Sequence, residues 1–172
     1  NTFFGGGLVA HVGFAEPFCP VLSHILYQTA KEAGAKVHNR GTYMVMEGPL
    51  FSTKAESFLY RSWGASVIGM TALPEAKLAR EAEICYATLA YVTDYDCWHE
   101  SHDSVTIEMV IANLLRSVEM AKKILKMVAT QIPEKRECQC ATALKDAIIT
   151  SPEHIPAQLK KELALLIGKY VK

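Results

Sequence analysis

The fold of this chain is decided by the stretch GTYMVMEGPLFSTKAESFLYRSWGASVIGMTALPE, residues 41–75. Apolar residues first alternate through Tyr43 and Val45 up to a Gly-Pro turn, which is the pattern of a strand. A helical segment of about Thr53–Trp63 follows, and the short apolar strand Ala65–Met70 comes next. A strand, a helix and a second strand in this order predict a sheet whose faces are covered by helices.

The flanking segments continue this alternation. Apolar residues at helical spacing predict helices over residues 20–34, 75–83 and 106–128. The apolar run Ile84–Val92 predicts a further strand that is buried on both faces. We therefore expect an α/β fold with a mixed, largely parallel sheet flanked by helices, in a single domain over residues 1–172.

The C-terminal part of the chain differs in composition. After Pro133 the sequence turns polar through EKRECQC, and apolar residues at helical spacing then return in two short groups. We expect residues 133–172 to form a helical tail of the same domain, with short helices over residues 141–149 and 157–167.

Size and charge limit the partners of this chain. A chain of 172 residues can bury roughly 70% of the surface that it exposes when unfolded, which is enough for a real core. Lys plus Arg equals Asp plus Glu at 18 each, so no electrostatic attraction to nucleic acid or to an anionic membrane is expected. The longest apolar stretch is about half of the ~20 residues that cross a bilayer, and no signal-peptide pattern precedes it. We expect a cytoplasmic protein.

Five cysteines, an odd number, also favour a reducing compartment. Cys138 and Cys140 are the exception, because two thiols this close in a polar segment could stay free, form a disulfide or bind a soft metal. A metal is the least favoured of the three, since no second thiol pair in the sequence supplies the remaining ligands.

Polar side chains follow the predicted strands in three segments, MEGPLFST, GMTALPE and TDYDCWHE, residues 46–53, 69–75 and 93–100. Ligands of open α/β sheets gather at such strand ends. Each residue alone could be a core side chain, a helix cap or a turn residue. Together they provide an aromatic ring, two hydroxyls, a thioether and two carboxylates, which suit a planar heterocycle with ring nitrogens and an amine: Phe51, Ser52, Thr71, Met70, Asp94 and Asp96.

The motifs EGPxFSTxAES, GMT followed by PE, and TDYD, in this order and spacing, resemble the second half of the 5'-methylthioadenosine phosphorylases, within the trimeric purine nucleoside phosphorylase family. The resemblance is close from about His11 to Val118. It implies phosphorolysis of 5'-methylthioadenosine to adenine and 5-methylthioribose 1-phosphate, a pentosyltransferase reaction of purine and methionine salvage. It further implies inorganic phosphate as co-substrate, no cofactor, no metal, and a homotrimer, with a hexamer as an alternative.

The resemblance also implies how the base is read. Phe51 would stack on the base beside Ser52, Asp94 would face N7, and Asp96 would face the exocyclic amine. A 6-oxo group would point its lone pairs at Asp94, a clash that costs ~1–3 kcal/mol. Relatives that use 6-oxopurines carry Glu in place of Ser52 and Asn in place of Asp94, so this chain is expected to prefer 6-aminopurines.

Asp94 is the candidate catalytic residue, a general acid that protonates N7 while phosphate displaces the base. That role requires Asp94 to hold a proton near neutral pH. An apolar site and the neighbouring Asp96 carboxylate would both promote this, because each disfavours the charged form of Asp94.

The remaining roles concern the sugar and the phosphate. By resemblance, Ile68 belongs to the substrate site, Met70 lines the ribose and Thr71 contacts phosphate. His11 would reach the 5' group in the pocket of an adjacent subunit. Four aliphatic residues would meet the 5' substituent and favour methylthio over hydroxyl: Val105, Ile107, Val110 and Ile111. The 6-oxopurine relatives have a histidine where Ile107 stands.

Other hypotheses stay open. The stretch DYDCWHESHD, residues 94–103, contains residue types that a metallohydrolase could use, although their spacing matches no recognised ligand motif. The family's N-terminal half, which holds its Gly-rich phosphate loop, has no counterpart here. The chain is therefore either completed by another chain or a catalytically incomplete fragment. Arg80, His102 and Asp103 are expected to be solvated surface residues.

Overall fold

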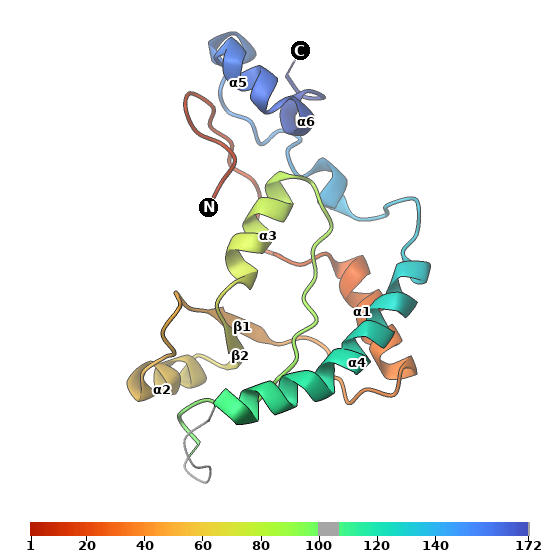
Figure 1. Ribbon diagram of the computed structural model, residues 1–172. Helices are drawn as coiled ribbons and strands as arrows, with labels where there is room; N and C mark the ends of the chain where they lie inside the picture. The colour runs from red at the N-terminus through yellow and green to blue at the C-terminus, as the bar shows by residue number, and fades with distance from the viewer. Residues whose placement is uncertain (100–106, 172) are drawn as a thin grey trace. The chain divides into compact units, whose positions relative to one another are not determined.

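A computed structural model describes residues 1–99 and 107–171 (Figure 1). The chain divides into two compact units, which we call unit 1 (Asn1–Ser23, Leu73–Thr88 and Pro133–Lys172) and unit 2 (His24–Ala72 and Leu89–Ile132). The elements in chain order are α1 (Pro20–Glu32), β1 (Thr42–Val45), α2 (Lys54–Ser62), β2 (Ala65–Gly69), α3 (Ala72–Glu81), α4 (Ile107–Gln131), 3-10 helices Gln139–Thr142 and Pro152–His154, α5 (Ala157–Glu162) and α6 (Ala164–Ile167).

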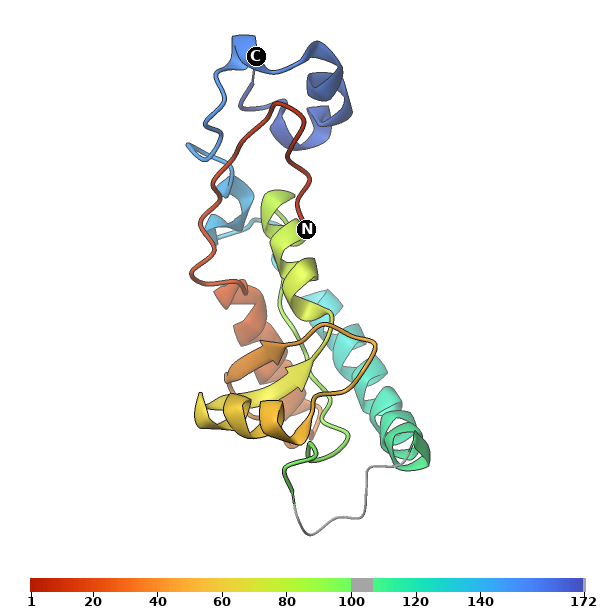
Figure 2. The same ribbon diagram turned by 90° about the vertical axis from the view of Figure 1, so that its left-hand side faces the viewer.

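The sheet of unit 2 consists of β1 and β2, which run parallel. Tyr43 pairs with Val67 and Val45 pairs with Gly69. The crossover between the strands is α2, which lies against the strand pair (Figures 1 and 2). A glycine is required opposite β1, since a Cβ at Gly69 would lie 2.2 Å from the Tyr43 hydroxyl. The predicted strand-helix-strand order is therefore confirmed.

Helix α2 begins and ends where its sequence signals predict. The Thr53 side chain accepts a hydrogen bond from the Glu56 amide, and the Glu56 carboxylate accepts one from the Thr53 amide, which makes a capping box. Trp63 is the C-cap, and Gly64 follows with a φ of 78°, a left-handed conformation that glycine adopts without strain.

Helices α1 and α4 are joined at their C-terminal ends within unit 2. The Thr29 hydroxyl donates to the Gln131 side chain at 3.0 Å, and Lys123 Nζ donates to the Ala33 carbonyl at 2.9 Å. Ile124 and Val128 on α4 are buried. The N-terminal part of α4, in contrast, exposes aliphatic side chains, among them Ile107, Ile111, Leu114 and Leu115.

The core of unit 1 is built from both ends of the chain. Its buried residues are Phe4, Leu8, Leu144, Ile155 and Ile167. Backbone contacts align the N-terminal segment with the 147–150 segment, through an antiparallel bridge between Ala10 and Ile148 and a 2.8 Å hydrogen bond from the His11 amide to the Ala147 carbonyl. Residues 133–172 are thus packed with residues 1–23 inside one unit.

A buried carboxylate ties this core together. Glu83 adopts a φ of 56° and accepts hydrogen bonds from the Leu144 amide at 3.0 Å and the Tyr170 hydroxyl at 2.5 Å. It also forms an ion pair with Lys169. Burial alone would raise the pKa of Glu83, but the hydrogen bonds from Lys169, Tyr170 and the Leu144 amide outweigh burial and lower it.

Several predicted elements differ from the structure. Residues 84–92 form no strand, because they pair with neither of the two strands in the described part of the chain. The hydroxyls of Thr88 and Tyr91 in this segment are buried and have no hydrogen-bond partner among the described residues. In place of a helix over residues 141–149 there are only a 3-10 turn and further turns, and the helix predicted over 157–167 is divided between α5 and α6.

No helix in the described ranges is long and apolar enough to span a bilayer.

Candidate active site

The loop of residues 93–99 is anchored to α2 by a carboxylate. Asp96 Oδ2 accepts a 2.5 Å hydrogen bond from the hydroxyl of Ser57, a residue of α2 that is only 2% exposed. Asp96 Oδ1 accepts one from the Cys97 amide at 2.8 Å. The hydroxyl of Ser52 lies 3.3 Å from both oxygens. Asp96 and Ser52 thus lie side by side, in an orientation that Ser57 fixes.

Asp94 is held by its neighbours in a different way. Its Oδ2 accepts a 2.6 Å hydrogen bond from the Thr93 hydroxyl. The Thr93 carbonyl in turn accepts a 2.5 Å hydrogen bond from Nδ2 of Asn113, which projects from α4. This chain of contacts connects the candidate acid to the long helix, whose first turns are expected to bind the 5' group.

Aromatic contacts stabilise Trp98 and His99, the next residues of the same loop. The Arg61 guanidinium on α2 lies over the Trp98 ring at 3.9 Å from its centroid, a cation–π contact worth roughly 0.5–1 kcal/mol when exposed. His99 stacks on Tyr95 at 4.8 Å and meets Trp98 edge-on at 5.0 Å. The loop is therefore attached to α2 at two points, Asp96 and Trp98.

The other residues expected around the base and ribose lie at the ends of β1 and β2. Phe51 is 82% exposed on the turn after β1, so one face of its ring is accessible for stacking. Ile68 lies in β2 and is half-buried, and Met70 follows that strand. A Cβ at Gly48 would lie 2.7 Å from Met70 Sδ. The glycine therefore lets the thioether approach the turn that carries Phe51. Thr71 is exposed directly before α3.

The residues expected to contact the 5' substituent are described in part. Ile107 opens α4 and is 71% exposed, and Ile111 one turn later is 49% exposed. Val110 lies on the same helix, whereas Val105 lies outside the described residues. His11 is an exposed residue of unit 1.

Sequence reasoning missed the residues that hold the two aspartates. Ser57 was visible in the AES part of the motif, four positions after the cap Thr53, and a small polar residue on the inner face of a short helix is a signal for a buried hydrogen bond. Thr93 and Asn113 carried no such signal, since their contact connects positions 20 residues apart in the sequence.

The contacts of this loop favour binding of an organic ligand over binding of a metal ion. The carboxylate of Asp96 is directed at two serines and an amide, and the His99 ring stacks on Tyr95 and meets Trp98 edge-on. Among the described residues, Asp94, Asp96 and His99 do not converge as a group of metal ligands. His102 and Asp103 lie outside the described residues.

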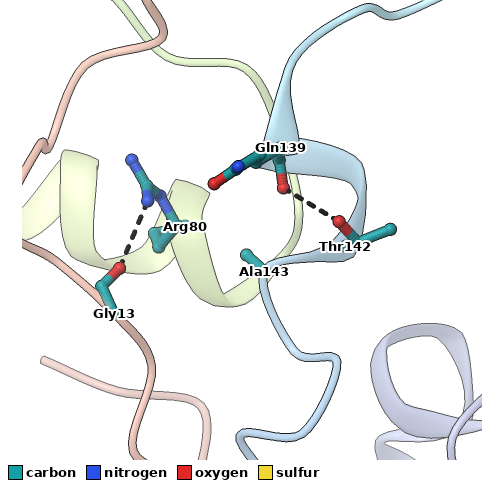
Figure 3. A pocket seen from close by; sticks show the side chains of 5 residues that line it. All are labelled: Gly13, Arg80, Gln139, Thr142 and Ala143. Carbon is teal, nitrogen blue, oxygen red and sulfur yellow. Dashed lines mark hydrogen bonds between the residues drawn. The ribbon is translucent and has the colours of Figure 1, made fainter.

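Unit 1 has a surface depression of about 310 Å³ lined by polar groups (Figure 3). Its lining residues are Gly13, Arg80, Gln139, Thr142 and Ala143. Arg80 was expected to be a solvated surface residue, and this was wrong. Its guanidinium donates to the carbonyls of Gly13 at 3.2 Å and Pro17 at 3.3 Å, and also to that of Glu16. Arg80 therefore holds the N-terminal segment against α3. None of the predicted substrate-binding residues lines the depression.

Comparison with known proteins assigns the chain to a family. The sequence profile of the phosphorylase superfamily matches residues 1–130, three quarters of the chain. The chain therefore belongs to the phosphorylase superfamily, as its motifs predicted, and its sheet and helices are a part of that fold.

Individual relatives agree with this assignment. The S-methyl-5'-thioadenosine phosphorylase of Geobacter sulfurreducens is 60% identical over 171 residues, which are 99% of this chain and 60% of the relative. A crystal structure of a methylthioadenosine phosphorylase from an antarctic soil metagenomic library matches 96% of this chain and 59% of its own, with 45% identity and a TM-score of 0.88. The methylthioadenosine phosphorylase from Schistosoma mansoni in complex with adenine matches at 33% identity, with a TM-score of 0.74 over 85% of this chain and 58% of its own.

The chain thus spans about 60% of the length of these relatives.

Proposed function

We propose that this chain is the purine-binding part of a 5'-methylthioadenosine phosphorylase. Such an enzyme converts the nucleoside and phosphate to adenine and 5-methylthioribose 1-phosphate. The observation that carries the proposal is the anchored pair of acidic residues, Asp96 on Ser57 and Asp94 on Thr93, at the end of a loop held against α2. The names of the relatives support the same substrate class.

Asp96 and Ser52 would read the 6-amino group together. In the free chain, the Ser52 hydroxyl shares one proton between both oxygens of Asp96 at 3.3 Å, which is long for a hydrogen bond between two oxygens. The contacts from Ser57 and the Cys97 amide are much shorter. An exocyclic amine can therefore replace the weak Ser52 contact without disturbing the strong ones, and the Ser52 hydroxyl can then turn toward the base.

Asp94 would act as the general acid. Thr93 holds its Oδ2, and N7 of the purine would meet Oδ1. Protonation of N7 makes adenine a neutral leaving group, and a well-placed general acid contributes roughly 10²–10⁴-fold to the rate. Phe51 would stack on the base, and Ile68 and Met70 would enclose the base and ribose.

The 5' end of the substrate would meet the start of α4. Ile107 and Ile111 expose aliphatic surface there. By resemblance, Val105 and Val110 would also meet the 5' substituent. A methylthio group gains from such contacts, whereas a hydroxyl would lose its hydrogen bonds to water without replacement. His11 of an adjacent subunit would approach the same group.

The phosphate site would be completed by residues outside this chain. Thr71 supplies a single hydroxyl, which cannot neutralise a phosphate dianion. We propose that a further segment contributes the cationic residues, and that the complete enzyme is a cytoplasmic homotrimer, or a hexamer, acting in purine and methionine salvage. It would need no cofactor and no catalytic metal.

The test is phosphorolysis by the intact enzyme, this chain together with the segment that completes it. Adenine release from methylthioadenosine should require phosphate and persist in a chelator. Adenine release without phosphate, or its loss on chelation, would favour the hydrolytic metalloenzyme. A chain that binds adenine but releases none from the nucleoside would be the catalytically incomplete fragment.

A further inference from the structure

Four cysteines of unit 1 converge on one point. The sulfur atoms of Cys19, Cys85, Cys138 and Cys140 all lie within 4.8 Å of one another, and those of Cys85 and Cys138 are 3.3 Å apart. All four are free thiols. The sequence offered only Cys138 and Cys140 as neighbours, and the absence of a second pair was the ground for disfavouring a metal. The fold supplies that second pair, Cys19 and Cys85.

Three separate segments deliver these thiols. Cys19 directly precedes α1, Cys85 follows α3, and the other two open the 3-10 helix of the C-terminal part. Backbone contacts hold the segments in register, because the Cys19 amide donates to the Tyr86 carbonyl at 2.7 Å and Arg136 Nη1 donates to the Glu83 carbonyl at 2.6 Å. The cluster is therefore fixed by its surroundings as well as by its own contacts.

The site is also shielded from solvent, and backbone amides are directed at two of its sulfurs. Cys19 is 1% exposed and Cys140 is 5% exposed. Cys19 Sγ accepts a hydrogen bond from the Leu22 amide at 3.5 Å, at the N-terminus of a 13-residue helix whose dipole favours negative charge. The Cys140 amide donates to the Cys138 sulfur. Such amide-to-sulfur contacts are the outer-shell support that ligating side chains need.

We propose that Cys19, Cys85, Cys138 and Cys140 form a binding site for one zinc ion in unit 1. Zinc bound by four thiolates is tetrahedral with Zn–S distances of about 2.3 Å, which places the sulfurs about 3.8 Å apart. The sulfurs here lie within 4.8 Å of one another, with those of Cys85 and Cys138 at 3.3 Å, and need only small side-chain adjustments to reach that spacing. Two of the ligands, Cys138 and Cys140, are separated by a single residue, and the other two come from distant segments. The zinc ion would therefore crosslink three segments of unit 1.

Binding would release protons and join the segments. The four thiols lose their protons to solvent and form four Zn–S bonds, with no change of oxidation state. The ion would connect residues 19, 85 and 138–140 and so stabilise the core around Leu144. Its function would be structural, since four protein ligands leave no open coordination position for a substrate or an activated water.

Metal stoichiometry in the full chain tests this proposal. The reduced chain is incubated with excess zinc without oxygen, dialysed and analysed by mass spectrometry for metal and for free thiols. We expect one zinc per chain, released by a mercurial that titrates thiols. Cobalt in place of zinc should give a thiolate-to-cobalt charge-transfer band and the ligand-field bands of a tetrahedral site. A cobalt spectrum that lacks thiolate ligation, or less than a tenth of an equivalent of zinc, would overturn the proposal.

Variants separate this site from other thiols. Cys85→Ser and Cys138→Ser should each weaken zinc retention at least tenfold, while Cys97→Ser, which alters the exposed cysteine of unit 2, should leave it unchanged. If the cluster variants fail to fold, the cobalt spectrum of the unaltered chain still decides. Two disulfides among these four residues that persist in the reductant would contradict zinc binding, since the sulfurs would then be unavailable as ligands.

Discussion

Ser57 donates a 2.5 Å hydrogen bond to Oδ2 of Asp96, a residue 39 positions away in the sequence. The contact joins the buried face of α2 to the loop that carries both candidate base-reading carboxylates. Because Ser57 is almost fully buried, its hydroxyl cannot exchange Asp96 for water. Asp96 is therefore fixed before any ligand arrives, which reduces the entropy cost of binding.

Ser57→Ala should weaken substrate binding more than it slows the chemical step. Removing the donor leaves Asp96 Oδ2 without its shortest contact, a change that costs about 1–3 kcal/mol. We expect the KM for methylthioadenosine to rise roughly tenfold or more, with a smaller change in kcat. Steady-state kinetics with Ser62→Ala, an exposed serine of the same helix, as the matched control would measure this. Equal effects in both variants would refute the anchoring role.

Asp94→Asn should slow phosphorolysis of 6-aminopurine nucleosides by roughly 10²–10⁴-fold, because an amide cannot give a proton to N7. The same variant should gain relative activity on 6-oxopurine nucleosides, whose oxo group can accept a hydrogen bond from the new amide. The measurement is kcat/KM for both classes in the two proteins. Undiminished activity of the variant on methylthioadenosine would remove Asp94 from the role of acid.

Asp94 and Asp96 show what the sequence could and could not predict. The spacing of TDYD after an apolar run was enough to select Asp94 and Asp96 as a pair, and the comparisons confirm the family on which their roles rest. Their partners Ser57 and Thr93 were not predicted. The Thr93 contact joins neighbouring residues, but the sequence pattern does not specify the side-chain orientations that it needs. The Ser57 contact depends on tertiary packing, because it connects α2 to a residue 39 positions away. The cysteine cluster was missed for the same reason, because its four members come from three distant segments.

Secondary structure was likewise predicted correctly where its signals are local and incorrectly where it depends on distant partners. Helix α2 could be placed to within a residue, because its capping box and terminal glycine are local signals. Residues 84–92 were predicted to be a strand from their apolar composition, yet a strand exists only with a partner, and no described strand pairs with them. Arg80 looked like a surface residue because its backbone acceptors at residues 13–17 cannot be identified from sequence.

Ile107→His should shift the preference at the 5' position from methylthio toward hydroxyl. An imidazole offers a hydrogen bond to a 5'-hydroxyl and removes aliphatic surface from the methylthio group. We expect the ratio of kcat/KM for methylthioadenosine over adenosine to fall about tenfold, within the range of 10–200-fold that one small apolar contact can supply. Leu125→His, an exposed position in the C-terminal half of α4, is the matched control and should leave the ratio unchanged.

The ion pair of Glu83 with Lys169 should make unit 1 sensitive to acid. The pKa of Glu83 is lowered in the folded chain, since its hydrogen bonds outweigh burial, which alone would raise it. Glu83 therefore contributes stability above the pKa of an unfolded glutamate, about 4.3, and loses it as the pH falls through the lowered folded value. Half of the Lys169 side chain is exposed, so solvent screening weakens its part of this contribution.

Thermal unfolding as a function of pH would measure this effect. Glu83→Gln should unfold at a lower temperature than the unaltered chain at pH 7, and the difference should shrink as the pH falls below about 4. Glu137→Gln, which neutralises an exposed carboxylate of the same unit, should show little difference at either pH. A gap for Glu83→Gln that stays constant with pH would show that charge is not its cause.

Asp94 and Asp96 are assigned to bind the base of methylthioadenosine, and Ile107 its 5' group, while the methylthioribosyl group is transferred to phosphate. The most direct measurement is adenine release from methylthioadenosine by the intact enzyme, with and without phosphate, comparing the unaltered chain with Asp94→Asn. We predict release that requires phosphate, is accompanied by an equal amount of 5-methylthioribose 1-phosphate, and falls at least a hundredfold in the variant. Release that is independent of phosphate, or equal in both proteins, would contradict the assignment.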